Sequence, residues 1–167
     1  IDIDPQGSAT SGLGARNTGE RPTTYDVIMG ERAVRDAVLP TQLECLHLLP
    51  AHRDLVGAEV ELVAALAREF RLREALQSVR DEYDFVLIDC PPSLGQLTQA
   101  ALTASTEVLM PIQCEFYAME GLTQMIDVIR QVMERNPARM QFGGIVLTMY
   151  DHTLELTHEV EREVREF

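Results

Sequence analysis

The sequence predicts an α/β fold, in which helices flank a mainly parallel sheet, built as one domain over residues 1–167. The first observation is that short aliphatic runs, bounded by turn residues, alternate with segments of helical periodicity, as expected for βαβ units. The second is that 167 residues with 46% hydrophobic content can bury one sizeable core. No internal repeat or linker-like change of composition divides the chain.

Four apolar stretches predict the strands. The stretch at 84–89, "DFVLID", is aliphatic without alternation, which is typical of a strand buried on both faces. The stretch at 46–51, "LHLLPA", is expected to stop at Pro50. The remaining two are "EVLMPI" at 107–112 and "FGGIVLTMY" at 142–150.

Helical spacing of apolar residues predicts the segments between the strands. A Thr-x-x-Asp pattern at Thr23–Asp26 predicts a capping box before a short helix that Gly30 closes. Longer helices are expected at 67–82, at 118–135, where Asn136-Pro137 would end the helix, and at 156–167.

Composition excludes several classes of function. A formal net charge of −13 argues against a broad nucleic-acid-binding face on this part of the protein, because phosphate binding needs clustered cations. The apolar runs are far shorter than the roughly 20 residues of a membrane span, so no transmembrane segment is expected. Three cysteines without paired spacing favour reduced thiols in the cytoplasm.

Polar residues at strand ends are the candidates for chemistry, since ligands of parallel sheets bind at the carboxyl ends of strands. Asp89 ends an aliphatic run, as the Mg²⁺-directed aspartate of nucleotide hydrolases does, although such an Asp can also cap a helix or a turn. The Pro91-Pro92 pair after it fixes the departing chain. Asp4 could orient an attacking water or form an Asx turn with its own backbone.

Taken together, five motifs resemble the ParA/Soj chromosome- and plasmid-partitioning ATPases, relatives of MinD. They are, in order, "IDIDPQGSATSGLG", "LPAHRDLVGAEVELV", "YDFVLIDCPPSLG", "MPIQCEFYAMEGL" and "GGIVLTMYD". The resemblance runs from Ile1 to Phe167 and implies a P-loop NTPase fold of the deviant Walker A, SIMIBI type. All fourteen basic residues are arginine, so the lysine-containing KGGxGKTT loop of that family is not in this chain. We therefore expect a fragment, truncated at both ends, that does not bind ATP tightly by itself.

The resemblance also assigns roles to individual residues. It implies that Asp4 positions the hydrolytic water, that Asp89 holds Mg²⁺ through water, and that Asp2 supports the strand end and the Mg²⁺ shell. The remaining assignments are a γ-phosphate-sensing segment at Pro91, Pro92 and Ser93, base-proximal residues at Thr148 and Met149, and a nucleotide or interface loop at Gln113 and Glu115.

The implied activity is Mg-dependent ATP hydrolysis in an ATP-bound homodimer that binds DNA non-specifically and answers to a ParB-type centromere-binding protein. The implied location is the cytoplasm, in association with the nucleoid. Two alternatives stay open: a MinD-like ATPase that positions a membrane or another cargo, and a ParA-like scaffold without enzymatic activity. Two departures from the family pattern are Ala100, where Asn is typical, and His152-Thr153-Leu154, where Gly-Arg-Thr is frequent. Because the Arg of that Gly-Arg-Thr sequence is absent here, the contact that it makes in the family is in doubt for this chain.

Overall fold

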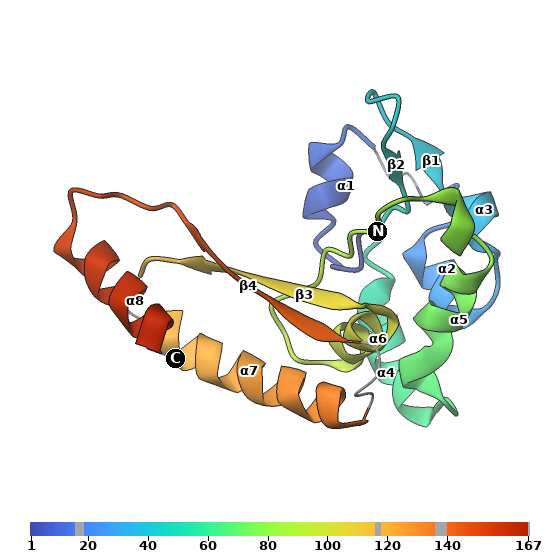
Figure 1. Ribbon diagram of the computed structural model, residues 1–167. Helices are drawn as coiled ribbons and strands as arrows, with labels where there is room; N and C mark the ends of the chain where they lie inside the picture. The colour runs from blue at the N-terminus through green and yellow to red at the C-terminus, as the bar shows by residue number, and fades with distance from the viewer. Residues whose placement is uncertain (16–18, 116–117, 136–139, 167) are drawn as a thin grey trace. The chain divides into compact units, whose positions relative to one another are not determined.

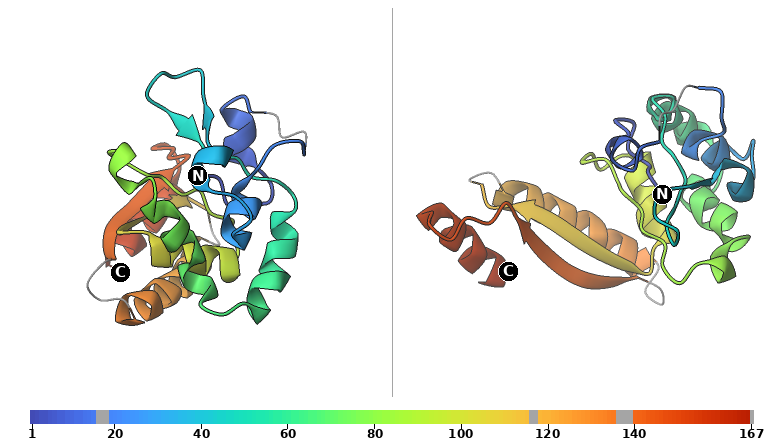
Figure 2. Two further views of the ribbon diagram at one scale, coloured as in Figure 1. Left: turned by 90° about the vertical axis from the view of Figure 1, so that its right-hand side faces the viewer. Right: turned by 90° about the horizontal axis from the view of Figure 1, so that it is seen from above.

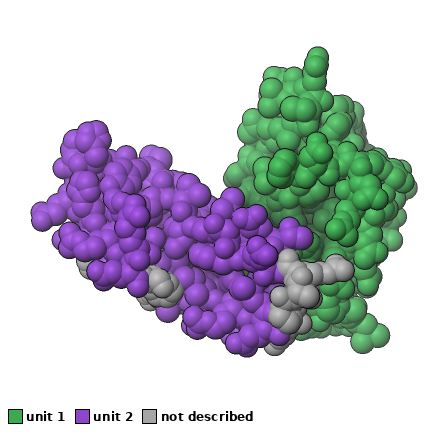
Figure 3. Space-filling view, viewed as in Figure 1, with its two compact units in different colours: residues 1–105 green, residues 106–167 purple. Residues whose placement is uncertain are grey.

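The computed structural model describes residues 1–15, 19–115, 118–135 and 140–166. The chain forms two compact units, residues 1–105 and residues 106–167 (Figure 3). The expectation of one domain over 1–167 stays a prediction.

Helices dominate unit 1 (Figure 1). Its only regular strands among the described residues form a two-residue antiparallel pair, in which Leu39 lies opposite Leu48. In chain order the elements are α1 Ser8–Gly12, α2 Thr24–Met29, α3 Val34–Ala37, β1 Leu39–Pro40, β2 His47–Leu48, α4 Leu55–Ala64, η1 Arg68–Phe70, α5 Arg71–Gln77, η2 Arg80–Glu82 and α6 Gln96–Ala104.

Local sequence signals explain several of these helices. The expected capping box begins α2: the Asp26 carboxylate accepts a hydrogen bond from the Thr23 backbone N–H at 2.7 Å, and the Thr23 side chain accepts one from the N–H of Asp26. Gly30 closes the helix at φ 80°, a left-handed conformation that favours glycine. The helix expected at 67–82 is present as three shorter helical segments, η1, α5 and η2. Its apolar stripe is confirmed at Leu72 and Val79, which are buried.

The core of unit 1 lies where α2, α4, α5 and α6 pack around the first residues of the chain. Each of these elements contributes at least one fully buried aliphatic side chain, and their burial supplies the hydrophobic stabilisation of the unit. The largest are Ile3, Ile28, Leu55, Leu62, Leu72 and Leu97.

The segment at 84–89 differs from the prediction. Among the residues that the structure describes, it pairs along one edge, through a parallel bridge between Asp2 and Asp89. Asp89 N–H donates to Ile1 O, and Ile3 N–H donates to Asp89 O. The expectation of burial on both faces is wrong, because the side chains of Phe85 and Leu87 are 86% and 76% exposed. Aliphatic composition predicted the strand-like path but not what covers it.

Unit 2 is a βαβ unit followed by one more helix, with elements β3 Glu107–Gln113, α7 Ala118–Arg135, β4 Gln141–Thr148 and α8 Glu155–Glu166. The two strands are parallel, with Glu107 opposite Gln141 and Gln113 opposite Thr148. The right-hand view of Figure 2 shows α7 running alongside this pair. The strands at 107–112 and 142–150 and the helices at 118–135 and 156–167 are thus confirmed to within two residues, except that Asn136-Pro137 lies outside the described residues.

Candidate functional site

Three carboxylates gather where two parallel segments of unit 1 end. The bridge between Asp2 and Asp89 brings these residues side by side, and Asp4 follows two residues later. Partial burial raises the pKa of Asp89, and the negative charges of Asp2 and Asp4 raise it further. The structure therefore brings the three predicted acids into one electrostatic neighbourhood, which favours a cation.

Asp2 is fully buried, and both of its carboxylate oxygens accept hydrogen bonds. Oδ1 accepts from the backbone N–H of Asp4 at 3.1 Å, whereas Oδ2 accepts from the N–H and the hydroxyl of Thr10, each at 2.7 Å. The Thr24 hydroxyl donates a hydrogen bond to the backbone carbonyl oxygen of Asp2, at 2.8 Å. Asp2 is held by the loop that follows it, which leaves its role in a Mg²⁺ shell a prediction.

Asp4 is half-buried at the start of a tight turn. Its carbonyl oxygen accepts a hydrogen bond from Gly7 N–H at 2.9 Å, and its Oδ1 accepts one from Gln6 N–H at 2.9 Å, which is the Asx turn expected for Asp-Pro. Gly7 has φ 66° and ψ 36°, a left-handed conformation that disfavours other residues. Among the described residues, nothing donates a hydrogen bond to the second carboxylate oxygen of Asp4, so an Asx turn and a water-orienting role are compatible.

The loop after Asp89 leads into α6 through an unusual cap. Gly95 occupies the N-cap position and has no side chain to accept hydrogen bonds from the first turn. Glu59 of α4 supplies the acceptor instead, because its carboxylate accepts from Gln96 N–H at 2.7 Å. Pro91 before this turn is buried, whereas Pro92 and Ser93 are exposed.

Sequence reasoning missed Glu59 and Thr10, the side chains that fix the two loops. The sequence signal for Glu59 was indirect: "LGQLTQ" begins a helix with no Ser, Thr, Asp or Asn at the N-cap position, so the acceptor for the first turn had to come from another element. The signal for Thr10 was equally indirect, since it lies eight residues from the carboxylate that it contacts.

The other predicted residues lie in unit 2, at the carboxyl ends of β3 and β4. Gln113 and Thr148 are neighbours across the parallel pair, and the Thr148 hydroxyl donates to Ile112 O at 3.2 Å. Met149 follows with φ 52° and an 81% exposed side chain. Glu115, also exposed, donates its N–H to Gln113 O. The predicted residues thus form two groups, one in each unit.

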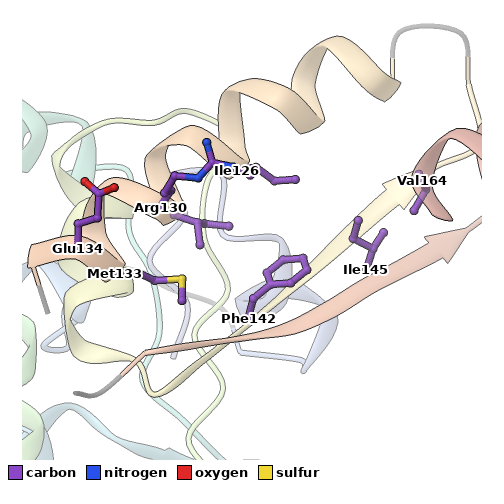
Figure 4. Close-up of a pocket in the computed structure, with 8 residues that line it drawn as sticks. Ile126, Arg130, Met133, Glu134, Phe142, Ile145 and Val164 are labelled. Carbon is purple, nitrogen blue, oxygen red and sulfur yellow. The ribbon is translucent and has the colours of Figure 1, made fainter. Parts of the chain in front are cut away.

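A separate apolar hollow of about 600 Å³ lies in unit 2 between α7, β4 and α8. Figure 4 shows the side chains that line it, with Phe142 and Ile145 coming from β4 and Val164 from α8. Arg130 and Glu134 of α7 add one charge of each sign to an otherwise aliphatic and aromatic wall. None of the predicted site residues lines this hollow.

Other kinds of site find no support in the part of the chain that the structure describes. It contains no group of three His, Cys, Asp or Glu side chains arranged to hold a metal ion by themselves. No helix there is long and apolar enough to cross a membrane. The three cysteines are free thiols, and burial beside Asp89 raises the pKa of the Cys90 thiol to about 11.

Comparison with known proteins places this fold and these motifs in a family. The model of the AAA domain family matches residues 1–142. The chromosome partitioning protein ParA of Caulobacter vibrioides is 48% identical over 167 residues, which cover 99% of this chain and 62% of ParA. The sporulation initiation inhibitor protein Soj of Bacillus subtilis is 44% identical, over 100% of this chain and 66% of Soj. The chain thus spans slightly less than two thirds of these relatives.

Solved structures agree with the fold. A cobyrinic acid a,c-diamide synthase from Mycobacterium smegmatis, with bound ATP analog and magnesium, superposes with a TM-score of 0.92 at 36% identity, over 99% of this chain and 67% of that one. Apo McdA from Cyanothece has a TM-score of 0.90 at 20% identity, over 99% of this chain and 68% of that one, which supports the fold alone.

These matches define the class first: the chain belongs to the AAA domain family and has the α/β fold of the P-loop ParA-like ATPases. Within that class, the chain is 44–48% identical, over nearly all of its length, to proteins named ParA and Soj chromosome partitioning proteins and a Soj sporulation initiation inhibitor. The resemblance stated from the motifs is therefore confirmed.

Proposed function

We propose that the complete gene product is a ParA/Soj-type partitioning ATPase, which hydrolyses ATP with Mg²⁺ and uses the nucleotide as a switch in DNA segregation. The observation that carries the proposal is the gathering of Asp2, Asp4 and Asp89 at the ends of two parallel segments. Parallel sheets bind ligands at these ends. The proposal concerns the complete gene product because this chain contains no lysine to neutralise phosphates.

In this proposal, Asp89 and Asp4 have different roles. Asp89 is partly buried and close to two like charges, and both the burial and the repulsion raise its pKa. A Mg²⁺ ion bound through water would offset both effects. Asp4 has one carboxylate oxygen without a partner among the described residues, which would be available to orient a water toward the γ-phosphate. When bound, Mg²⁺ would neutralise charge on the phosphates.

The other predicted residues complete this assignment. The loop of Pro91, Pro92 and Ser93 would respond to the γ-phosphate, because it leaves the metal site directly and its end is held by Glu59. Thr148 and Met149 would lie near the base, and Gln113 and Glu115 would belong to a nucleotide or dimer-interface loop. The family membership supports these roles.

The switch itself would operate between two subunits. We infer an ATP-bound homodimer in the cytoplasm that binds DNA non-specifically and associates with the nucleoid, together with a ParB-type protein that stimulates hydrolysis and release. A net charge of −13 on this chain means that the DNA-binding cations would have to come largely from elsewhere in the protein.

The test is ATP hydrolysis by the complete gene product, measured with Mg²⁺ and with excess EDTA. Hydrolysis should require Mg²⁺ and should fall at least about tenfold in Asp89→Asn, which keeps the shape of the side chain but removes its charge. The matched control is Asp36→Asn, at an exposed position of α3. Equal loss in both variants, or turnover in EDTA, would contradict the proposal.

A further inference from the structure

The first turn of α1 lacks a side-chain cap of its own. Its N-cap residue is Gly7, and no side chain from the N-cap position accepts a hydrogen bond from the helix. The carboxylate of Asp2, five residues before Gly7, supplies this acceptor by binding the N–H of Thr10 at 2.7 Å. A buried carboxylate therefore sets the direction in which the chain leaves the Asp4 turn.

The Thr10 hydroxyl completes this arrangement and has a defined orientation. It accepts a hydrogen bond from the Ala51 backbone N–H at 2.9 Å and lies 2.7 Å from Asp2 Oδ2. Because the amide of Ala51 can only donate, the hydroxyl proton is directed toward Asp2. Thr10 is 3% exposed, so water cannot easily replace either bond.

Asp4 is connected to this network through its backbone. The other oxygen of the same carboxylate, Asp2 Oδ1, accepts the N–H of Asp4 at 3.1 Å. Thr10 thus holds Asp2 from one side while Asp2 holds the backbone of Asp4 from the other. Of the two aspartates, only Asp4 retains a carboxylate oxygen without a partner among the described residues.

We infer that Thr10 is a positioning residue for Asp4: its hydroxyl, fixed between Asp2 and the Ala51 amide, keeps the Asp4 turn in the geometry that hydrolysis requires. This inference rests on the proposed function. It predicts that loss of the hydroxyl lowers turnover more than nucleotide binding, because misplacement by about 1 Å can cost about a hundredfold in rate.

The experiment compares Thr10→Val with Thr10→Ser in the complete gene product. Val is close to Thr in shape but has no hydroxyl, whereas Ser restores it. We expect kcat to fall between about ten- and a hundredfold in Thr10→Val with KM changed less than about threefold, and Thr10→Ser to stay near the native kcat. Thr103→Val is the matched control, since Thr103 is buried in α6 and its hydroxyl donates only to Gln99 O in the same helix.

Hydrogen exchange supplies a readout that does not depend on activity. The amides of Gln6 and Gly7, both bonded to Asp4, should exchange faster in Thr10→Val and at the native rate in Thr10→Ser. If Thr10→Val fails to fold, Thr10→Ala replaces it, because it avoids placing a second methyl group against the carboxylate.

The outcomes separate the two claims. If the native protein hydrolyses no ATP, the proposed function is refuted, and faster exchange in Thr10→Val alone then supports the positioning of the turn. Unchanged exchange in that variant overturns the inference in every case. So does a kcat that falls equally in Thr10→Val and Thr103→Val, because that result would reflect general destabilisation.

Discussion

The cap that Glu59 provides to α6 gives the sharpest prediction for stability. A Cβ atom added to Gly95 would lie 2.4 Å from Glu59 Oε1 and 2.5 Å from Oε2, distances that real Cβ contacts do not show. The backbone of Gly95 has φ −80° and ψ −166°, which alanine adopts without strain. In Gly95→Ala, the Glu59 carboxylate must therefore swing away and release the amides of Gln96 and Leu97.

Two opposing terms set the magnitude. Loss of an N-terminal cap costs about 0.5–2 kcal/mol of the free energy of unfolding. Replacement of Gly by Ala at a compatible backbone conformation restores about 0.4–1 kcal/mol by restricting the unfolded chain. Gly95→Ala should therefore destabilise the protein by about 0.5 kcal/mol. In a Glu59→Ala background, where the cap is already absent, the same substitution should be neutral or stabilising.

The assay is a double-mutant cycle by urea denaturation of the complete gene product. The predicted coupling free energy between Gly95 and Glu59 equals the contribution of the cap, about 0.5–2 kcal/mol. Gly12→Ala is the control, because a Cβ on Gly12 meets nothing within 4 Å and its effect should not depend on Glu59. Additive effects of Gly95→Ala and Glu59→Ala would refute the cap, since the two changes would then act independently.

The remaining predictions concern pH and thiol reactivity. The fold raises the pKa of the Asp89 carboxyl above its value in the unfolded chain. The protonated carboxyl therefore favours folding at pH values below the unfolded pKa, and this stabilisation is lost as the pH rises through the raised pKa of the folded state. In EDTA, Asp89→Asn should therefore flatten the dependence of Tm on pH above the usual titration range of a carboxyl group, and an unchanged slope would contradict the shift. With a pKa of about 11, Cys90 should react with iodoacetamide at pH 8 far more slowly than exposed Cys45, accelerating about tenfold per pH unit. Mass spectrometry of the labelled peptides would show this, and equal labelling of both thiols would exclude it.

Periodicity and turn residues predicted much of the fold. The Thr23–Asp26 capping box and the parallel pair β3–β4 are present because their signals are local: a cap within one helical turn, and two aliphatic runs joined by a helix. The path of residues 84–89 shows the limit of such reasoning. Its aliphatic character indicates that the side chains could be buried, but exposure depends on neighbours distant in sequence, and Phe85 remains 86% exposed.

The sequence indicated the acids that the fold brings together, but not the side chains that hold them. Asp89 could be proposed because it ends an aliphatic run before two prolines, and Asp4 because it stands before a Pro-Gln-Gly turn. Thr10 and Glu59 could not, because each acts through a hydrogen bond to a residue or backbone amide that only the fold brings near. Likewise, nothing in the sequence indicates that both carboxylate oxygens of Asp2 accept hydrogen bonds within the chain.

Single-turnover hydrolysis by Asp4→Ala tests the central claim most directly. The complete gene product and this variant would each be mixed with radiolabelled ATP and Mg²⁺, with bound nucleotide and released phosphate followed separately. The account predicts that Asp4→Ala binds ATP as the native protein does but hydrolyses it at least about a hundredfold more slowly. Hydrolysis at the native rate by Asp4→Ala would contradict the assignment of Asp4 to the attacking water.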